Sequence, residues 1–87
     1  MKTPEQVLTE AGFTHYAAGN GCHEYIKKLD GKLSMQISGV GLQEILSDND
    51  PVGIGVFESD NPGGKWQYQK EYGSFKEMME NEKKLEQ

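Results

Sequence analysis

The feature that most constrains this fold is an Asp-Gly pair set between two stretches that alternate apolar and polar residues. Asp30-Gly31 divides the segment "CHEYIKKLDGKLSMQIS", residues 22–38. Asp-Gly is favoured in tight hairpin turns, whose central residues need a positive φ. On the second arm every other residue is apolar: Leu33, Met35 and Ile37. Such alternation is typical of a strand with one buried and one solvated face, so the segment predicts an antiparallel hairpin.

The sequence leaves the register of this hairpin open. A two-residue turn pairs Ile26 with Met35. A three-residue turn with a glycine bulge pairs Tyr25 with Met35 instead and brings His23 to the same face. Because a shift of one residue exchanges the two faces of a strand, either Ile26 or Tyr25 faces the core.

A second hairpin is expected from residues 52–72. Its first arm, "VGIGVFES", has Gly53 and Gly55 on one face and the branched apolar residues on the other: Val52, Ile54 and Val56. Two glycines on one strand face often mark the close approach of another group to the backbone. In the second arm, "KWQYQKEY", three aromatic residues share one parity: Trp66, Tyr68 and Tyr72. A domain this small needs its largest apolar groups inside, so we expect these rings in the core.

The segment between the hairpins, "GVGLQEILSDNDP", breaks the alternation. Leu42, Ile45 and Leu46 have helical spacing, which favours one helical turn or a tucked loop over residues 41–50. Asp48 to Pro51 then ends the segment with turn-forming residues.

Capping signals predict a helix near each end of the chain. Thr3 and Gln6 form a capping box with Pro4 at the first helical position. Ser74 and Glu77 form a second capping box, which opens a helix with an apolar stripe. The stripe consists of Phe75, Met78, Met79 and Leu85.

This order predicts one small α+β domain over residues 1–87. A short N-terminal helix precedes an antiparallel sheet of about four strands, made of two hairpins joined by the irregular crossing. The C-terminal amphipathic helix packs on one face of that sheet. A short additional strand at residues 14–17 is compatible with the sequence.

Composition excludes several classes of function. All nine basic residues are lysine, and the net charge is −5. Arginine makes most bidentate phosphate contacts, and phosphate neutralisation carries most nucleic-acid affinity, so direct nucleic-acid binding is not expected. Residues 1–10 hold no run typical of a signal peptide, and no stretch is apolar enough to cross a membrane. A cytoplasmic protein without membrane association is the expectation.

The adjacent residues Cys22, His23 and Glu24 are the types that build catalytic and metal sites. On a strand, however, neighbouring side chains point to opposite faces, which separates the thiol from the imidazole. The only other histidine is His15, and these spacings match no known metal signature. The sequence therefore predicts no catalytic residue, no metal site and no cofactor.

The candidate binding residues are acidic and lie in the middle of the chain. Between Leu33 and Gly64 the chain has five carboxylates and no lysine: Glu44, Asp48, Asp50, Glu58 and Asp60. An acidic loop surface steers association with a basic one. The sequence therefore predicts a non-enzymatic protein-binding module whose partner is a protein with a basic surface.

In size and charge the chain is similar to short acidic proteins of phages and mobile elements, some of which inhibit a host complex by occupying a basic cleft. This likeness covers no motif and implies an inhibitor as one form of the predicted module. The alternative is a small-ligand or single-stranded nucleic-acid binder that uses the aromatic strand face at Trp66 and Tyr68. The oligomeric state is left open.

Overall fold

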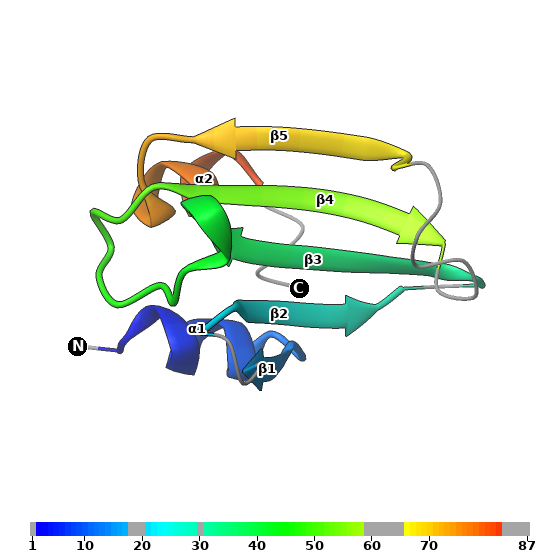
Figure 1. Cartoon of the computed structure of the whole chain (residues 1–87), viewed down its shortest axis with the longest axis horizontal. Coiled ribbons are helices and arrows are strands. Elements are labelled where there is room, and N and C mark those ends of the chain that lie inside the picture. The colour runs from blue at the N-terminus through cyan, green and yellow to red at the C-terminus, as the bar shows by residue number, and fades with distance from the viewer. Residues whose placement is uncertain (1, 18–20, 30, 59–65, 83–87) are drawn as a thin grey trace.

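The chain forms a five-stranded antiparallel sheet with a short helix at each end of the sequence, as Figure 1 shows. The computed structural model describes residues 2–17, 21–29, 31–58 and 66–82. The elements are α1 (Pro4–Glu10), β1 (Thr14–Ala17), β2 (His23–Lys28), β3 (Leu33–Gly39), the 3₁₀ turn η1 (Val40–Leu42), β4 (Val52–Glu58), β5 (Tyr68–Tyr72) and α2 (Phe75–Asn81). Each strand pairs with the next in the order β1-β2-β3-β4-β5.

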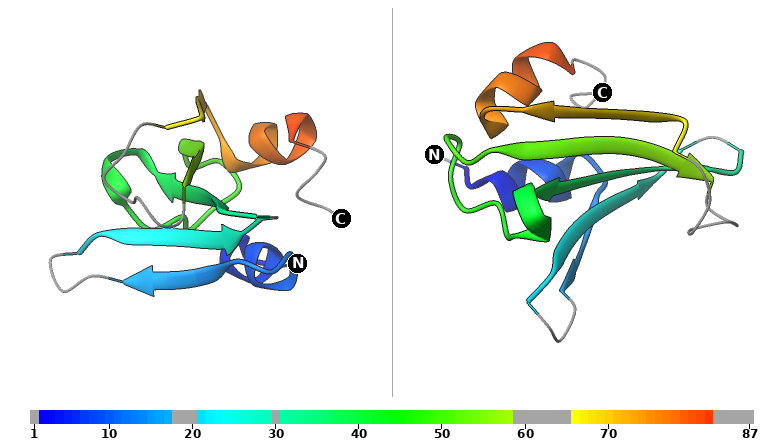
Figure 2. Two further views of the ribbon diagram at one scale, coloured as in Figure 1. Left: turned by 90° about the vertical axis from the view of Figure 1, so that its right-hand side faces the viewer. Right: turned by 45° about the horizontal axis from the view of Figure 1, so that its top comes forward.

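The predicted α+β class is confirmed, with five strands in place of about four. The additional strand is β1, in which His15 lies opposite Tyr25 and Ala17 lies opposite His23. Both helices lie on the same side of the sheet, as the two views of Figure 2 show. No helix in the described parts of the chain is long and apolar enough to cross a bilayer.

Helix α1 begins as its sequence predicts, and a glycine turn follows its end. The Thr3 hydroxyl accepts from the Gln6 backbone N–H at 3.2 Å, and the Gln6 side chain accepts from the Thr3 N–H at 2.9 Å. Gly12 then takes a φ of +101°, which a residue with a side chain rarely adopts. This turn lets the Phe13 N–H donate to the Leu8 carbonyl at 2.9 Å and directs both apolar side chains into the core.

The first hairpin has the three-residue connection and the core-facing Tyr25 of the second sequence alternative, but its pairing differs from both alternatives. Tyr25 pairs with Ile37, and Lys27 pairs with Met35. The Leu29 N–H donates to the Leu33 carbonyl at 2.8 Å, so the connection is one residue longer than a two-residue turn. Tyr25 therefore faces the core with an exposed fraction of 0%.

The core lies between the inner face of the sheet and the two helices. Strands, helices and the crossing segment all contribute buried apolar side chains: Leu8, Phe13, Tyr25, Ile37, Ile45, Val52, Ile54, Tyr72, Phe75 and Met78. Helix α2 is also held at its start, where the Phe75 and Lys76 N–H groups donate to the Asp50 and Asp48 carbonyls at 2.8 and 2.9 Å. Leu85, the last residue of the predicted stripe, lies outside the described residues.

The crossing segment is a tucked loop with a 3₁₀ turn at its start, one of the two forms that the sequence allows. Gly41 and Leu42 have φ values of +75° and +62°. Both values interrupt right-handed helical geometry. The Asp50 carboxylate accepts from the Leu46 and Ser47 N–H groups at 2.9 and 3.1 Å and closes the loop. Helical spacing would have buried both Ile45 and Leu46, but only Ile45 is buried and Leu46 is 71% exposed.

The docking of α2 predicts unequal effects of two alanine substitutions on stability. Met78 is fully buried, so Met78→Ala should lower the free energy of unfolding by about 2–4 kcal/mol. Asn81→Ala, on the exposed side of the same helix, should change it by less than about 1 kcal/mol. Chemical denaturation followed by circular dichroism measures both values. Equal stability of the two variants would mean that α2 is not packed on the sheet.

Candidate functional site

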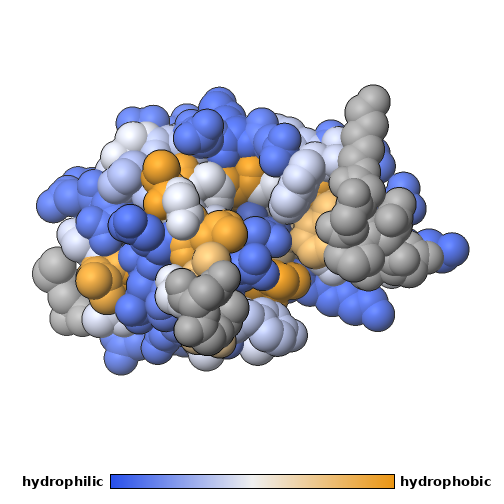
Figure 3. Space-filling view, viewed as in Figure 1, coloured by the Kyte–Doolittle hydropathy of each residue, from blue (hydrophilic) through white to orange (hydrophobic). Residues whose placement is uncertain are grey.

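The face of the sheet opposite the helices carries an open groove of about 480 Å³. Figure 3 views the molecule from this face, where apolar side chains lie interspersed among polar ones. The floor of the groove is β4 at Gly53 and Gly55, and η1 borders it. Because both glycines lack a side chain, the side chains of the neighbouring strands β3 and β5 project above β4 and form the walls.

The register of the sheet explains this shape. Gln36 of β3 and Gln69 of β5 both lie opposite Gly55, on its two sides. In the same way Ser38 and Glu71 flank Gly53: the Ser38–Gly53–Glu71 row lies next to the Gln36–Gly55–Gln69 row on the same face. Adjacent strands are about 4.8 Å apart, so the polar residues of each row stand about 10 Å apart across the groove.

Trp66 forms one end of the groove and contacts its floor directly. A Cβ atom on Gly55 would lie 2.6 Å from Cζ3 and 2.7 Å from Cε3 of the Trp66 indole. The Phe57 ring meets the indole edge-on, with centroids 5.3 Å apart and an interplanar angle of 73°. Gly55 is therefore the close backbone approach that the paired glycines predict, and the approaching group is Trp66.

The three aromatic residues of the second hairpin do not share one face. Tyr72 is in the core, whereas Tyr68 is 41% exposed on the helix side, where both hydroxyls donate to the Glu82 carboxylate. This hydrogen bond, with burial, raises the pKa of Tyr72. Trp66 lies on the open face, so the prediction that the three rings form a common core row is wrong.

A backbone irregularity causes this exchange of faces. Tyr68 pairs with Val56, yet the Gln67 N–H donates to the Val56 carbonyl at 2.8 Å. Two residues thus oppose one, as in a β-bulge, and the alternation of side chains shifts by one residue. Parity counting from the sequence assumes an unbroken strand and so places Trp66 on the wrong face.

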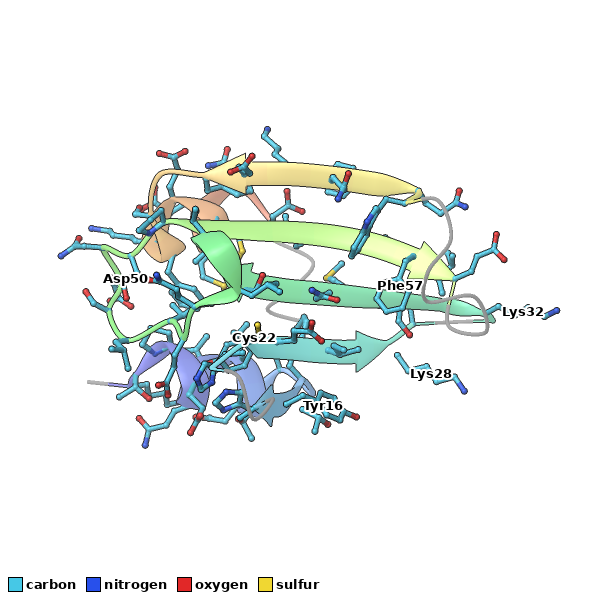
Figure 4. All side chains as sticks on the ribbon, in the orientation of Figure 1. Tyr16, Cys22, Lys28, Lys32, Asp50 and Phe57 are labelled. Carbon is cyan, nitrogen blue, oxygen red and sulfur yellow. The ribbon has the colours of Figure 1, made fainter. Side chains whose placement is uncertain are left out.

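The predicted acidic residues that lie within the described parts of the chain do not gather into one surface patch. Asp50 precedes β4 and Glu58 is its last residue. Because a strand rises about 3.3 Å per residue, the two carboxylates lie roughly 25 Å apart. Figure 4 shows this separation through the labels on Asp50 and Phe57, the neighbour of Glu58. Asp48 lies with Asp50 near the start of α2, and Asp60 falls outside the described residues.

Two of the residues considered as catalytic or metal ligands do meet. His15 Nε2 and His23 Nδ1 are 2.9 Å apart, and Glu44 lies beside them. Cys22 and Glu24 are not part of this group among the described residues. The additional strand at residues 14–17 is the sequence feature from which this histidine pair could have been predicted. Its pairing with β2 makes His15 a diagonal neighbour of His23.

Searches of protein-family models, curated proteins and solved structures find no match to this chain. Its function therefore has to be inferred from the chemistry of its own sites. The two that the structure brings together are the groove over Gly53 and Gly55 and the histidine pair.

The contact between Gly55 and Trp66 predicts a spectroscopic effect of substitution. Gly55→Ala should displace the indole, shift its fluorescence emission to longer wavelength and destabilise the fold by about 1–3 kcal/mol. Gly53→Ala is the matched control, because the nearest atoms to its added Cβ lie 3.9 Å away. Trp66 is the only tryptophan, so the emission reports this position alone. Identical spectra for the wild type and Gly55→Ala would contradict the packing of the indole on Gly55.

Proposed function

We propose that this protein is a non-enzymatic binding module whose groove takes a small, uncharged, polyhydroxylated ligand such as a sugar ring. The observation that carries the proposal is the placement of the Trp66 indole against Gly55, beside the uncovered Gly53, in two neighbouring polar–glycine–polar rows. The groove has a volume of about 480 Å³. This volume falls within the range of small-molecule sites.

The groove supplies the two kinds of contact that a sugar ring needs. An indole offers a broad apolar surface to the C–H face of the ring. The side chains along the walls supply hydroxyl, amide and carboxylate groups, which donate to and accept from ligand hydroxyls. They are Gln36, Ser38, Gln69 and Glu71. The indole covers the floor at Gly55, and the uncovered floor at Gly53 leaves room for a ring to lie beside it, between Ser38 and Glu71.

The charges around the groove favour a neutral ligand over a phosphorylated one. Glu71 contributes a negative charge to the lining. Lys70 also lines the groove, but its ammonium lies 5.2 Å from the centre of the Tyr72 ring, on the helix side of the sheet. Because the chain has no arginine, a bidentate guanidinium–phosphate contact is excluded.

Titration of the protein with a panel of neutral mono- and disaccharides, followed by backbone amide chemical shifts, tests the proposal. A binding sugar should perturb residues of the groove, and Trp66→Ala should weaken its affinity about tenfold, which corresponds to about 1.4 kcal/mol. Tyr68→Ala removes an exposed ring from the opposite face and should leave the affinity unchanged.

Two results would contradict the proposal. The first is that no sugar in the panel perturbs the groove at millimolar concentration. The second is that a nucleoside monophosphate binds more tightly than every sugar, because the groove would then recognise phosphate despite its lining.

A second candidate function is the binding of a basic protein surface through the crossing segment. Leu46 is 71% exposed. It lies between Glu44 and Asp48 in the sequence, which places an apolar anchor among acidic residues. An inhibitor that occupies a basic cleft would be one form of this function.

A lysine-rich peptide with apolar residues serves as the probe for this second candidate. It should perturb the amide signals of residues 44–50, and the effect should diminish as salt increases. Leu46→Ala should weaken the interaction, whereas Val40→Ala, which removes an exposed apolar side chain on η1, should not. Equal effects of the two substitutions would contradict this assignment.

A further inference from the structure

A second group of chemistry-bearing side chains lies where β1, β2 and the crossing segment meet. His15, His23 and Glu44 each offer a ligand atom, and these atoms lie within 4.8 Å of one another. We propose that these three side chains form a binding site for a divalent transition-metal ion of the Zn²⁺ type.

The fold brings the three residues together through separate elements. His15 and His23 are diagonal neighbours on one face of the β1–β2 pair. Glu44 comes from the crossing segment and precedes Ile45, whose side chain is buried in the core. Because Ile45 anchors the loop at this point, the position of Glu44 beside the imidazoles is set by core packing.

The His15 ring is held in an orientation suited to metal binding. Its Nδ1 is hydrogen-bonded to the Glu5 carboxylate, which leaves Nε2 as the atom that faces His23. A carboxylate on the outer nitrogen of an imidazole fixes the tautomer and raises the basicity of the inner nitrogen in metal sites. Tyr25 also holds the His15 ring in place. Its fully buried ring stacks on the imidazole, with ring centroids 4.4 Å apart.

The distance between the two imidazoles is close to that of two nitrogens on one ion. His15 Nε2 and His23 Nδ1 are 2.9 Å apart and share one proton as a hydrogen bond. A tetrahedral ion with Zn–N bonds of about 2.05 Å holds two nitrogens about 3.3 Å apart. Replacement of the shared proton by the ion therefore requires the two nitrogens to separate by only a few tenths of an ångström.

The ligand set selects the class of ion. Two imidazoles and one carboxylate suit Zn²⁺, Co²⁺ and related ions, whereas Mg²⁺ and Ca²⁺ prefer oxygen ligands alone. Three protein ligands leave at least one coordination position for water or an external ligand.

A buried polar group beside the cluster gives independent support. The Tyr25 hydroxyl lies near the Ile45 backbone but has no hydrogen-bond partner of normal geometry among the described residues. A buried hydroxyl without a partner is rare in native proteins and is often explained by a water or ion.

Calorimetric titration of the chelator-treated, tag-free protein with Zn²⁺ at neutral pH tests the site, with Mg²⁺ as the comparison ion. One Zn²⁺ should bind per chain, and the melting temperature should rise with Zn²⁺ but not with Mg²⁺. Titration with Co²⁺ should give visible absorption bands of a four- or five-coordinate ion with nitrogen and oxygen ligands.

The variants identify the ligands. His15→Gln, His23→Gln and Glu44→Gln should each weaken Zn²⁺ binding at least tenfold, and Glu5→Gln should weaken it about tenfold through the orientation of His15. Cys22→Ser and Glu24→Gln are the matched controls, since they change neighbouring ligand-type residues outside the cluster, and should bind Zn²⁺ as the wild type does. Glu44→Gln preserves the shape of a partly exposed loop residue, so it tests the site even where a histidine variant fails to fold.

Three outcomes would overturn the proposal. If the affinity for Zn²⁺ were no higher than that for Mg²⁺, the cluster would be a hydrogen-bonded histidine pair and not a metal site. Unchanged Zn²⁺ affinity in folded Glu44→Gln would remove the carboxylate from the site. Loss of binding in Cys22→Ser would assign the ion to a thiolate site of different composition. The sugar titration does not involve these residues, so the two proposals succeed or fail separately.

Discussion

Burial of one face of the sheet beneath two short helices is the constraint on which the rest of the structure depends. Helices α1 and α2 have seven residues each, a length that is not stable in water without tertiary packing. The helices in turn cover, together with Ile45 of the crossing segment, the fully buried side chains of the sheet: Tyr25, Ile37 and Val52. Each layer is therefore stable only in contact with the other, and both helices must lie on the same face.

Because both helices pack on one face of the sheet, the opposite face of the sheet is open. The glycines of β4 give that open face its shape. Gly55 admits the Trp66 indole, and Gly53 leaves an unfilled space between Ser38 and Glu71. The largest aromatic side chain is thus outside the core of a small protein. A binding surface is one physical reason for a chain of 87 residues to place it there.

Local signals in the sequence were sufficient to predict most helices and strands. The face of the sheet on which a side chain lies, and the contacts between distant residues, depend on backbone irregularities and strand pairing that have no marker in the sequence. The capping residues Thr3 and Ser74 mark both helix starts, because a cap is a contact between near neighbours. The bulge before Tyr68 has no such marker, and it reverses the face of Trp66.

The candidate site residues show the same limit. Cys22 and His23 are adjacent in the sequence and so suggest a common site. In an extended chain their side chains point to opposite faces, and His23 instead contacts His15, which is eight residues away. In the same way, sequence proximity suggested a single acidic patch, and the extended strand β4 carries Glu58 away from Asp50. Both outcomes follow from strand geometry, which turns neighbours in sequence away from each other and brings distant residues into contact.

Nuclear Overhauser contacts of the Trp66 ring test the division between a covered and an open face most directly. The account predicts contacts from the indole Hε3 and Hζ3 protons to the Gly55 α-protons, an upfield ring-current shift of those α-protons, and contacts to Phe57. Contacts from the indole to Met78 or Leu8, with unshifted Gly55 protons, would place Trp66 in the core and contradict the account.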